Sequence, residues 1–222
     1  HFPDYGYSPF MNEKFYEDWT HDLKWGIHQA RCVVGHNLKV AWNLTRMHSL
    51  MPKESYKTFA HQIADAIPGA GCDNQRGGWY DMMERTLKEG EENYRRVWHD
   101  RKAWWQQEQG ILAYYIMAGV YDDKPEYLNF AREGTAFYNG WFLDYESGGI
   151  YFNVLANGQP YALGSERGKG SHSMAGYHSF ELCFLAAIYS NLLVNKEPMD
   201  FYFKPDPQAW PENKLRVAPD LL

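Results

Sequence analysis

The fold prediction starts from residues 35–52, which read GHNLKVAWNLTRMHSLMP. Apolar side chains recur there at spacings of three and four residues, at Val40, Leu44, Met47 and Met51. This spacing places them on one face of an α-helix. Pro52 would end the helix, because proline cannot donate to the backbone hydrogen-bond ladder. The stretch therefore predicts an amphipathic helix over residues 36–51 that packs against other helices.

The same kind of spacing predicts four more helices. They are expected at residues 53–67, 102–120, 125–142 and 177–193. Gly-Gly-aromatic segments at residues 77–80 and 148–153 should each form a turn and a short strand, and the second should pair near Gly158. This unit occurs twice, about 70 residues apart, which is typical of helix pairs around a toroid. A short helix is also expected at residues 12–19, and mostly loop at 83–101.

Charge and composition argue against two classes of partner. The 222 residues carry a net charge of −6, and Lys and Arg form no basic run. We therefore expect no binding to nucleic acid or to an anionic membrane. The apolar stretches are too short or too interrupted to span a bilayer, so we expect a soluble protein. Cys32, Cys72 and Cys183 lack the spacing of a zinc site, and this favours a reduced, cytoplasmic setting.

Aromatic residues are unusually abundant, with 9 Trp, 17 Tyr and 12 Phe. The apolar faces of sugar rings pack on aromatic rings, so this composition is typical of a sugar-binding cleft. The alternative is that large aromatic side chains simply fill a wide helical barrel.

Four motifs occur in an order and at spacings that resemble a known family. They are GHNLKVAW at residues 35–42, GGWY at 77–80, KAWWQQEQ at 102–109 and GYH at 176–178. Over about residues 33–193 they look like the landmarks of the N-acylglucosamine 2-epimerase and cellobiose 2-epimerase superfamily. The resemblance implies a mainly α fold, part of an α/α toroid of the six-hairpin barrel type, with short β-hairpins at the mouth that holds the active site.

The family barrel has twelve helices in two rings, and the resemblance begins near the middle of a typical member. Residues 1–198 would then form the C-terminal half of the barrel, and residues 199–222 a Pro-rich tail or the start of another module. The expected partner is the N-terminal half of the barrel or another chain, because an uncovered half barrel would expose large apolar faces.

The resemblance implies that His36 and His178 act as acid and base. Moving a proton on or off the carbon beside a sugar carbonyl requires a group that both gives and takes protons near pH 7, and histidine is such a group. Either histidine could instead be a core or capping residue. The implied substrate is a small carbohydrate, and this chemistry needs no metal or organic cofactor.

Aromatic residues in the motifs are candidates for binding the sugar. Trp105 matches the family position where a ring stacks on the sugar. Trp104 would point about 100° away around the helix, so we expect it to pack instead. Trp79, Tyr80 and Tyr177 are further candidates for the pocket rim, with a structural role as the alternative.

Three positions depart from the family pattern and are also candidates for the binding site. Lys39 and Gln109 stand where the family commonly has Glu, and Glu181 stands where it has Arg. An ion pair between Lys39 and Glu181 would lower the pKa of the neighbouring His36 and raise that of His178. One histidine would then favour the base role and the other the acid role. Alternatively, Lys39 grips a uronate, sulfate or phosphate on an acidic sugar, or it is solvated.

Two other functions stay open. A glycoside hydrolase or lyase would need carboxyl groups across a cleft, roughly 5 to 9.5 Å apart for hydrolysis, and Asp81, Glu108 and Asp144 could supply them. A non-catalytic sugar-binding or scaffold module is indicated if His36 and His178 do not converge on one pocket.

Overall fold

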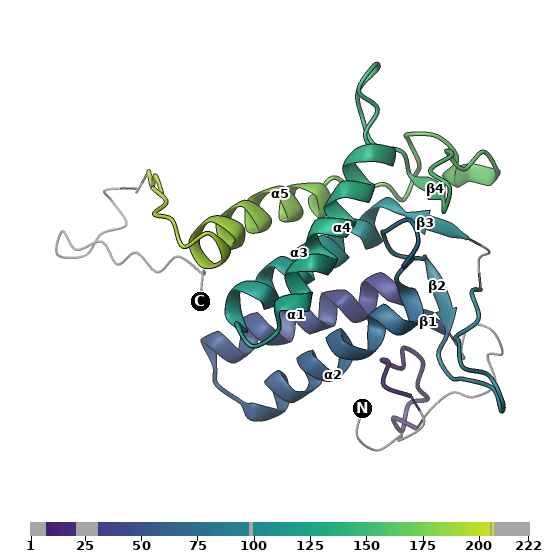
Figure 1. Cartoon of the computed structure of the whole chain (residues 1–222), viewed down its shortest axis with the longest axis horizontal. Coiled ribbons are helices and arrows are strands. Elements are labelled where there is room, and N and C mark those ends of the chain that lie inside the picture. The colour runs from purple at the N-terminus through teal and green to yellow at the C-terminus, as the bar shows by residue number, and fades with distance from the viewer. Residues whose placement is uncertain (1–7, 21–30, 98–99, 205, 207–222) are drawn as a thin grey trace.

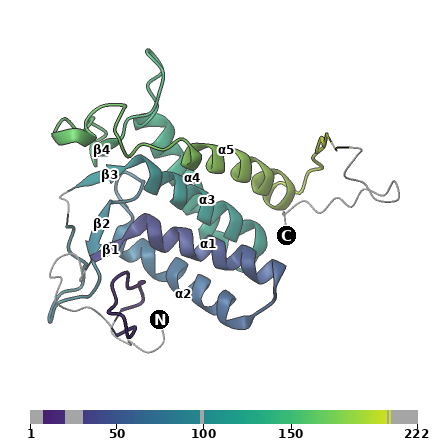
Figure 2. The same ribbon diagram turned by 180° about the vertical axis from the view of Figure 1, so that it is seen from behind.

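The computed structural model describes residues 8–20, 31–97, 100–204 and 206. Its α-helices are α1 (Val34–Leu50), α2 (Glu54–Gly71), α3 (Trp104–Val120), α4 (Pro125–Trp141) and α5 (Tyr177–Tyr189). Helix α3 lies between α1 and α5, while α2 packs on α1 and α4 packs on α3 (Figures 1 and 2). Three helices thus form one layer and two form a second. The prediction of a mainly α fold is confirmed.

The core lies between the two helix layers. Large aliphatic side chains of α1, α2 and α3 are fully buried there, among them Leu38, Ile63, Ile67, Leu112 and Ile116. Burying such side chains is the main favourable contribution to folding. Among the described residues, no helix combines the length and the apolar character that crossing a membrane requires.

Two antiparallel strand pairs lie at one end of the helices (Figure 1). One pair joins β1 (Arg31–Val33) to β2 (Met82–Glu84), and the other joins β3 (Arg101–Ala103) to β4 (Asn153–Leu155). Strand β1 runs directly into α1, and β3 runs directly into α3. The strand pairs therefore fix where these two helices begin.

The strands differ from the sequence prediction in their bounds and partners. A short strand was expected in the first Gly-Gly segment, at residues 77–80, but β2 begins only at Met82, and Trp79 forms an isolated bridge with Cys72. The segment expected to be mostly loop, residues 83–101, contains most of β2 and the start of β3. Both pairs join segments that are distant in sequence, and local spacing carries no signal for such a partner.

The first Gly-Gly segment forms a turn that a lysine side chain stabilises by hydrogen bonds. Gly77 and Gly78 have φ values of 79° and 77°, a region that glycine enters without steric cost. Lys102 Nζ donates to Asp73 Oδ2 at 2.8 Å and to the Gly77 carbonyl at 2.7 Å. The Lys102 side chain is fully buried. The turn thereby ties the start of α3 to the end of α2.

The second Gly-Gly segment repeats this turn. Gly148 and Gly149 have φ values of 73° and 89°. Lys169 Nζ donates to Asp144 Oδ2 at 2.7 Å and to the Gly148 carbonyl at 2.8 Å. The two units therefore share the Gly-Gly sequence and a turn whose Asp side chain and Gly carbonyl both accept hydrogen bonds from a lysine. The expected pairing near Gly158 is present as a tight turn with a bridge between Val154 and Pro160, and β4 also pairs with β3.

Helix α2 continues past Pro68 to Gly71, although its end was expected at residue 67. A proline inside a helix leaves the carbonyl four residues earlier without its usual donor. Here that carbonyl belongs to Ala64, and Tyr114 of α3 donates its hydroxyl to it at 2.8 Å. A neighbouring helix thus replaces the bond that the proline removes.

Residues 12–19 form turns rather than the expected short helix. Trp19 has a φ of 65°, which a right-handed helix does not allow, and Asp18 accepts hydrogen bonds from the backbone and hydroxyl of Thr20. The backbone of Met11 donates to Asn37 Oδ1 at 2.8 Å. The segment is therefore held against the start of α1.

The last helix ends close to the expected position. A π-helical turn, η4 (Ser190–Val194), extends α5. No helix or strand occurs in the described residues 195–204 and 206. The division at residues 198 and 199 stays a prediction, since most of the expected tail lies outside the described residues.

Candidate active site

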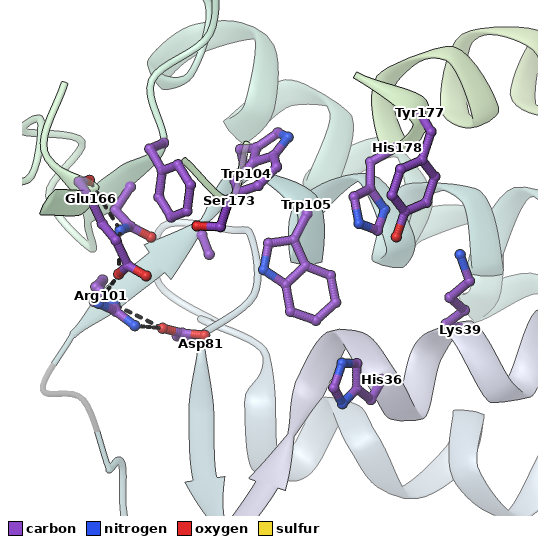
Figure 3. A pocket seen from close by; sticks show the side chains of 13 residues that line it. His36, Lys39, Asp81, Arg101, Trp104, Trp105, Glu166, Ser173, Tyr177 and His178 are labelled. Atoms are coloured by element: carbon purple, nitrogen blue, oxygen red, sulfur yellow. Dashed lines mark hydrogen bonds and ion pairs between the residues drawn. The ribbon is translucent and has the colours of Figure 1, made fainter. Parts of the chain in front are cut away.

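A cavity of about 380 Å³ lies at the N-terminal ends of α1, α3 and α5 (Figure 3). The side chains that line it include His36, Lys39, Asp81, Arg101, Trp105, Asn153, Glu166, Tyr177 and His178. The N-terminal end of a helix carries partial positive charge, because its first backbone N–H groups have no partner within the helix. Three such ends beside one cavity favour oxygen atoms with partial negative charge on a molecule bound there.

The two predicted histidines line this same cavity from different helices. His36 lies in the first turn of α1, and His178 is the second residue of α5. The Trp105 ring lies between them, with its centroid 5.2 Å from that of His36 and 5.6 Å from that of His178 (Figure 3). Trp104 also lines the cavity, but its ring is buried and packs on Phe152 at 4.4 Å. The arrangement brings two imidazoles and one exposed aromatic face together.

The side chain of His36 contacts a carboxylate, that of Glu13, which the sequence analysis missed. Its Nδ1 lies 3.0 Å from Glu13 Oε1, and Arg31 contacts the other oxygen of Glu13 at 3.2 Å. Burial raises the pKa of Glu13, but His36 and Arg31 more than offset this effect and bring the pKa below its usual value. Glu13 belongs to the segment at residues 12–19, and no motif marks it. Only the contact between that segment and α1 reveals its role.

His178 differs from the prediction in the direction of its pKa shift. The sequence predicted a raised pKa because of Glu181. The pKa of His178 is instead lowered to about 4, first by burial and then by the Lys39 ammonium, and Glu181 opposes both only in part. His178 is 9% exposed. An imidazole with this pKa is neutral at pH 7.

Lys39 and Glu181 form the ion pair that the exchanged residue types suggested. Lys39 Nζ lies 3.2 Å from Glu181 Oε2, and both side chains are about a quarter to a third exposed. The same ammonium lies 5.3 Å from the centroid of the Tyr177 ring, at the edge of the cavity. Lys39 is thus already paired within the protein.

Gln109 lies beneath the cavity and contacts His178 rather than lining the wall. Its Nε2 lies 3.3 Å from His178 Nδ1 and 3.1 Å from Glu181 Oε2. Its Oε1 accepts a hydrogen bond from Trp42 Nε1 at 2.8 Å. The side chain is fully buried. Gln109 therefore acts on a bound molecule only through His178.

The other end of the cavity carries charged residues from loops and strand ends. Arg101 donates from Nε to Asp81 Oδ2 at 2.7 Å and from Nη1 to Glu166 Oε2 at 2.8 Å (Figure 3). Burial raises the pKa of Asp81, and Arg101 opposes this effect. Gln106 donates to the second oxygen of Asp81. Sequence reasoning named Asp81 but missed Arg101 and Glu166, because no motif links these three positions.

Asn153 supplies a polar atom at this end of the cavity. The side chain is fully buried, and its Nδ2 donates to the backbone carbonyl of Glu166 at 3.3 Å. Within the described part of the chain, its Oδ1 has no hydrogen-bond partner. A buried carbonyl oxygen without a partner is costly, so Asn153 adds to the free energy that the rest of this end must offset.

Several predicted site residues lie away from the cavity. Trp79 is 1% exposed and stacks on Tyr114 at 5.4 Å, so it belongs to the core rather than to the pocket rim. Glu108 lines a separate groove between α4 and α5, where burial raises its pKa to about 7. Asp144 lies in the second turn, paired with Lys169. Of the three acids proposed for a hydrolase, only Asp81 lines the cavity.

Within residues 8–20, 31–97, 100–204 and 206, no group of three or more His, Cys, Asp or Glu side chains is arranged to hold a metal ion.

Comparison with known proteins gives a clear result for the fold. No model of a protein family matches the chain, and no curated protein matches it. Among solved structures, it resembles a D-mannose isomerase, with a TM-score of 0.62 and 19% identity over 78% of this chain. It also resembles cellobiose 2-epimerases from Bacillus thermoamylovorans B4167 (TM-score 0.63, 19% identity, 81% of this chain) and Spirochaeta thermophila DSM 6192 (0.64, 20%, 82%).

The chain spans 40 to 42% of the length of these three structures. The predicted resemblance to the N-acylglucosamine 2-epimerase and cellobiose 2-epimerase superfamily is therefore confirmed at the level of the fold. The chain has the fold of part of the α/α barrel found in these sugar isomerases and epimerases.

Proposed function

We propose that this chain carries the proton-transfer site of a carbohydrate isomerase or epimerase. The observation that carries the proposal is that His36 and His178 line one cavity on either side of Trp105. The named activities of the similar structures, D-mannose isomerase and cellobiose 2-epimerase, agree with it.

The proposed reaction moves one proton next to a sugar carbonyl. One imidazole removes the proton from the carbon beside the carbonyl, the C–H electron pair forms a carbon–carbon double bond, and the other imidazole protonates the carbonyl oxygen. The resulting enediol returns to a sugar when a proton is added to either carbon. Addition to the opposite face of the first carbon gives the epimer, and addition to the former carbonyl carbon gives the isomer. For the isomer, the imidazole that removed the proton delivers it to the former carbonyl carbon, and the other imidazole takes the proton of the second hydroxyl. For the epimer, a proton donor on the opposite side of the enediol must supply the proton, and the first imidazole releases the one that it removed.

The charges around the cavity support a neutral sugar over an acidic one. Lys39 is paired with Glu181, and Arg101 is paired with both Asp81 and Glu166, so neither cation is left to compensate a carboxylate or phosphate. Sugar hydroxyls suit the cavity better, because they can exchange hydrogen bonds with uncharged and already paired polar side chains that line it, such as Ser173 and Glu166. In this proposal Trp105 provides the apolar face on which the ring packs.

The proposal includes a partner that completes the barrel. On α5, Tyr177, Phe180 and Phe184 are 57%, 78% and 64% exposed, which forms an apolar face on the outermost helix of the layer. Leu50, the last residue of α1, and Met51, which follows it, also have exposed apolar side chains. Exposed faces of this kind indicate a surface that other helices cover. We propose that the remaining helices of the barrel cover them, from the same or another polypeptide.

A product assay tests the proposed function. The protein in its native assembly is incubated with neutral sugars, cellobiose, mannose and glucose among them, and with uronic acids and sugar phosphates. We expect an epimer or isomer of at least one neutral sugar, and loss of that product in His36→Gln and in His178→Gln. His48→Gln, which changes a partly buried histidine at the far end of α1, is the matched control.

The same assay separates the competing functions. Cleavage of a glycosidic bond without isomer formation would favour the hydrolase or lyase, with Asp81 and Glu166 as the carboxyl groups that line the cavity. Saturable sugar binding with neither reaction would favour the non-catalytic module. Either result would contradict the isomerase proposal.

A further inference from the structure

The two cavity histidines have opposite kinds of hydrogen-bond partner at their Nδ1 atoms. His36 Nδ1 faces the carboxylate of Glu13, whereas His178 Nδ1 faces the amide of Gln109. In a neutral imidazole one ring nitrogen carries the proton and the other has a lone pair, and the partner of one nitrogen decides the state of the other. The partners at Nδ1 therefore decide what each Nε2 offers to the cavity.

Glu13 is an acceptor, and this determines the state of His36. An ionised carboxylate has no proton to donate, and the contact with Arg31 at 3.2 Å favours the ionised form. The lowered pKa of Glu13 agrees with this assignment. His36 Nδ1 must then be the donor in the 3.0 Å contact. A neutral His36 consequently has its lone pair on Nε2.

Gln109 is a donor to His178, because its other contacts fix the direction of its amide. Trp42 Nε1 can only donate, so the atom that it contacts at 2.8 Å must be the amide oxygen. The Glu181 carboxylate accepts from the amide nitrogen at 3.1 Å. The second hydrogen of that nitrogen is directed to His178 Nδ1 at 3.3 Å. The two donors of the amide thus meet two acceptors.

We propose that Glu13 and Gln109 are positioning residues that hold His36 and His178 in opposite tautomers. His36 presents a bare Nε2, which is a base, and His178 presents an Nε2–H, which is a proton donor. The assignment of acid and base roles rests on the proposed function, while the tautomers exist without substrate. Lys39 supports the arrangement, because its ammonium disfavours a second proton on His178.

The arrangement divides the two roles between two imidazoles that are both neutral before the reaction begins. His36 takes the proton from the carbon beside the carbonyl and becomes imidazolium, stabilised by Glu13. His178 gives its Nε2 proton to the carbonyl oxygen. The imidazolate character that develops on His178 is stabilised by the N–H of Gln109 at Nδ1 and by the Lys39 ammonium. A carboxylate in place of Gln109 would instead favour a proton on Nδ1.

The tautomers can be measured directly by nitrogen NMR. The full chain is labelled with ¹⁵N at the histidine rings and studied at pH 9, where an ordinary imidazole is neutral. The signals are assigned by their loss in His36→Gln and in His178→Gln. We expect His36 to show a protonated Nδ1 and a bare Nε2, and His178 the reverse. A protonated Nε2 on His36, or a protonated Nδ1 on His178, would overturn the proposal.

Four variants distinguish positioning from a general structural role. Glu13→Gln keeps an acceptor and should leave the His36 tautomer unchanged, whereas Glu13→Leu removes the acceptor and should allow the proton to move to Nε2. Gln109→Glu replaces the donor by an acceptor and should move the proton of His178 to Nδ1. Gln109→Met matches the length of the side chain without either function and should not produce that reversal. Far-ultraviolet circular dichroism checks that each variant is folded.

The results separate this inference from the proposed function. If no sugar is converted but the wild-type tautomers are opposite, the positioning proposal holds and the isomerase proposal fails. If a sugar is converted while both histidines have the same tautomer, the isomerase proposal holds and the positioning proposal fails. Where Gln109→Glu and Glu13→Leu are folded and active on a sugar, each should lose at least tenfold in kcat with KM changed less.

Discussion

The two ends of the cavity are built in different ways. At the histidine end, His36, Trp105 and His178 all come from the first turns of helices, and each lies within a short sequence motif. At the charged end, Asp81, Arg101 and Glu166 come from a loop, a strand and a 3-10 turn with no motif in common. The first end depends on where helices begin, and the second on long-range ion pairs.

The two ends of the cavity also differ in what they can contribute to function. The histidine end has ring nitrogens available to a ligand, and we propose that it performs the chemistry. At the charged end Arg101 is bound to two carboxylates, so its groups mainly hold one another and the loops in place. Proton transfer should therefore depend on one end, and the stability and shape of the cavity on the other.

The largest effect is expected from Arg101→Met. Removing the guanidinium leaves the nearly buried carboxylate of Asp81 without its ionic partner, at a cost of about 3–5 kcal/mol in the free energy of unfolding. Urea denaturation at pH 7 measures the change. Arg95→Met removes the exposed partner of Glu91 and should have no measurable effect. Similar effects of both variants would show that the charged end is not the structural support that we describe.

The next effect is the dependence of stability on pH at the histidine end. An unfolded histidine has a pKa of about 6.5, and that of folded His178 is about 4. Between these values the unfolded state binds a proton that the folded state does not, so this contribution to stability is lost as the pH falls from about 6.5 to about 4. After allowance for solvent screening, we expect a loss of ~2 kcal/mol.

Denaturation of wild-type protein and of His178→Gln at pH 7 and pH 4.5 measures this effect. The variant should lose less stability than the wild type between the two pH values, by about the amount of that contribution. Equal losses in the two proteins would mean that His178 is protonated in the folded state at low pH without cost, which would contradict its burial.

Lys39→Met should raise the pKa of His178. The Lys39 ammonium is the second cause of the lowered value, after burial, and its removal also leaves Glu181 free to favour the protonated imidazole. We expect a rise of about one unit, measured by NMR titration. Lys57→Met, on α2, is the control. An unchanged pKa of His178 would mean that the Lys39 and Glu181 charges cancel at the ring.

The smallest effect is expected from Trp105→Phe. A smaller aromatic ring keeps a face for the sugar but loses contact area, at a cost of about 0.5–1.5 kcal/mol. KM should rise up to about tenfold while kcat changes little, because the ring is not a proton donor or acceptor. Trp141→Phe alters an exposed ring at the end of α4 and serves as the control. A large loss in kcat with KM unchanged would give Trp105 a different role.

Much of the fold could be predicted, because helices have a local signature. The apolar spacing and Pro52 identified α1 to within two residues at its start, and the Gly-Gly segments identified the repeated turns. The strand partners could not be predicted, since β3 pairs with a segment some 50 residues later. The end of α2 was missed because Tyr114, from another helix, satisfies the carbonyl that Pro68 leaves free.

The residues of the candidate site could likewise be predicted only where a local motif marks them. The motifs found the residues at helix starts, but Glu13, Arg101 and Glu166 reach the site only through tertiary contacts. Trp79 belongs to a motif, yet it is a core residue, because a motif does not state which way a side chain points. The argument from neighbouring charges predicted a raised pKa for His178, whereas the pKa is lowered. Burial is the main cause of this shift, and neighbouring charges in the sequence do not show burial.

The most direct test of the central claim, that the histidine pair moves a proton beside a sugar carbonyl, is deuterium incorporation. The protein in its native assembly is incubated with a neutral aldose in deuterated water, and NMR follows the hydrogen on the carbon next to the carbonyl. We predict incorporation at that carbon, and its loss in both His36→Gln and His178→Gln. Incorporation that persists in either variant, or its absence from every sugar that the wild-type protein binds, would contradict the account.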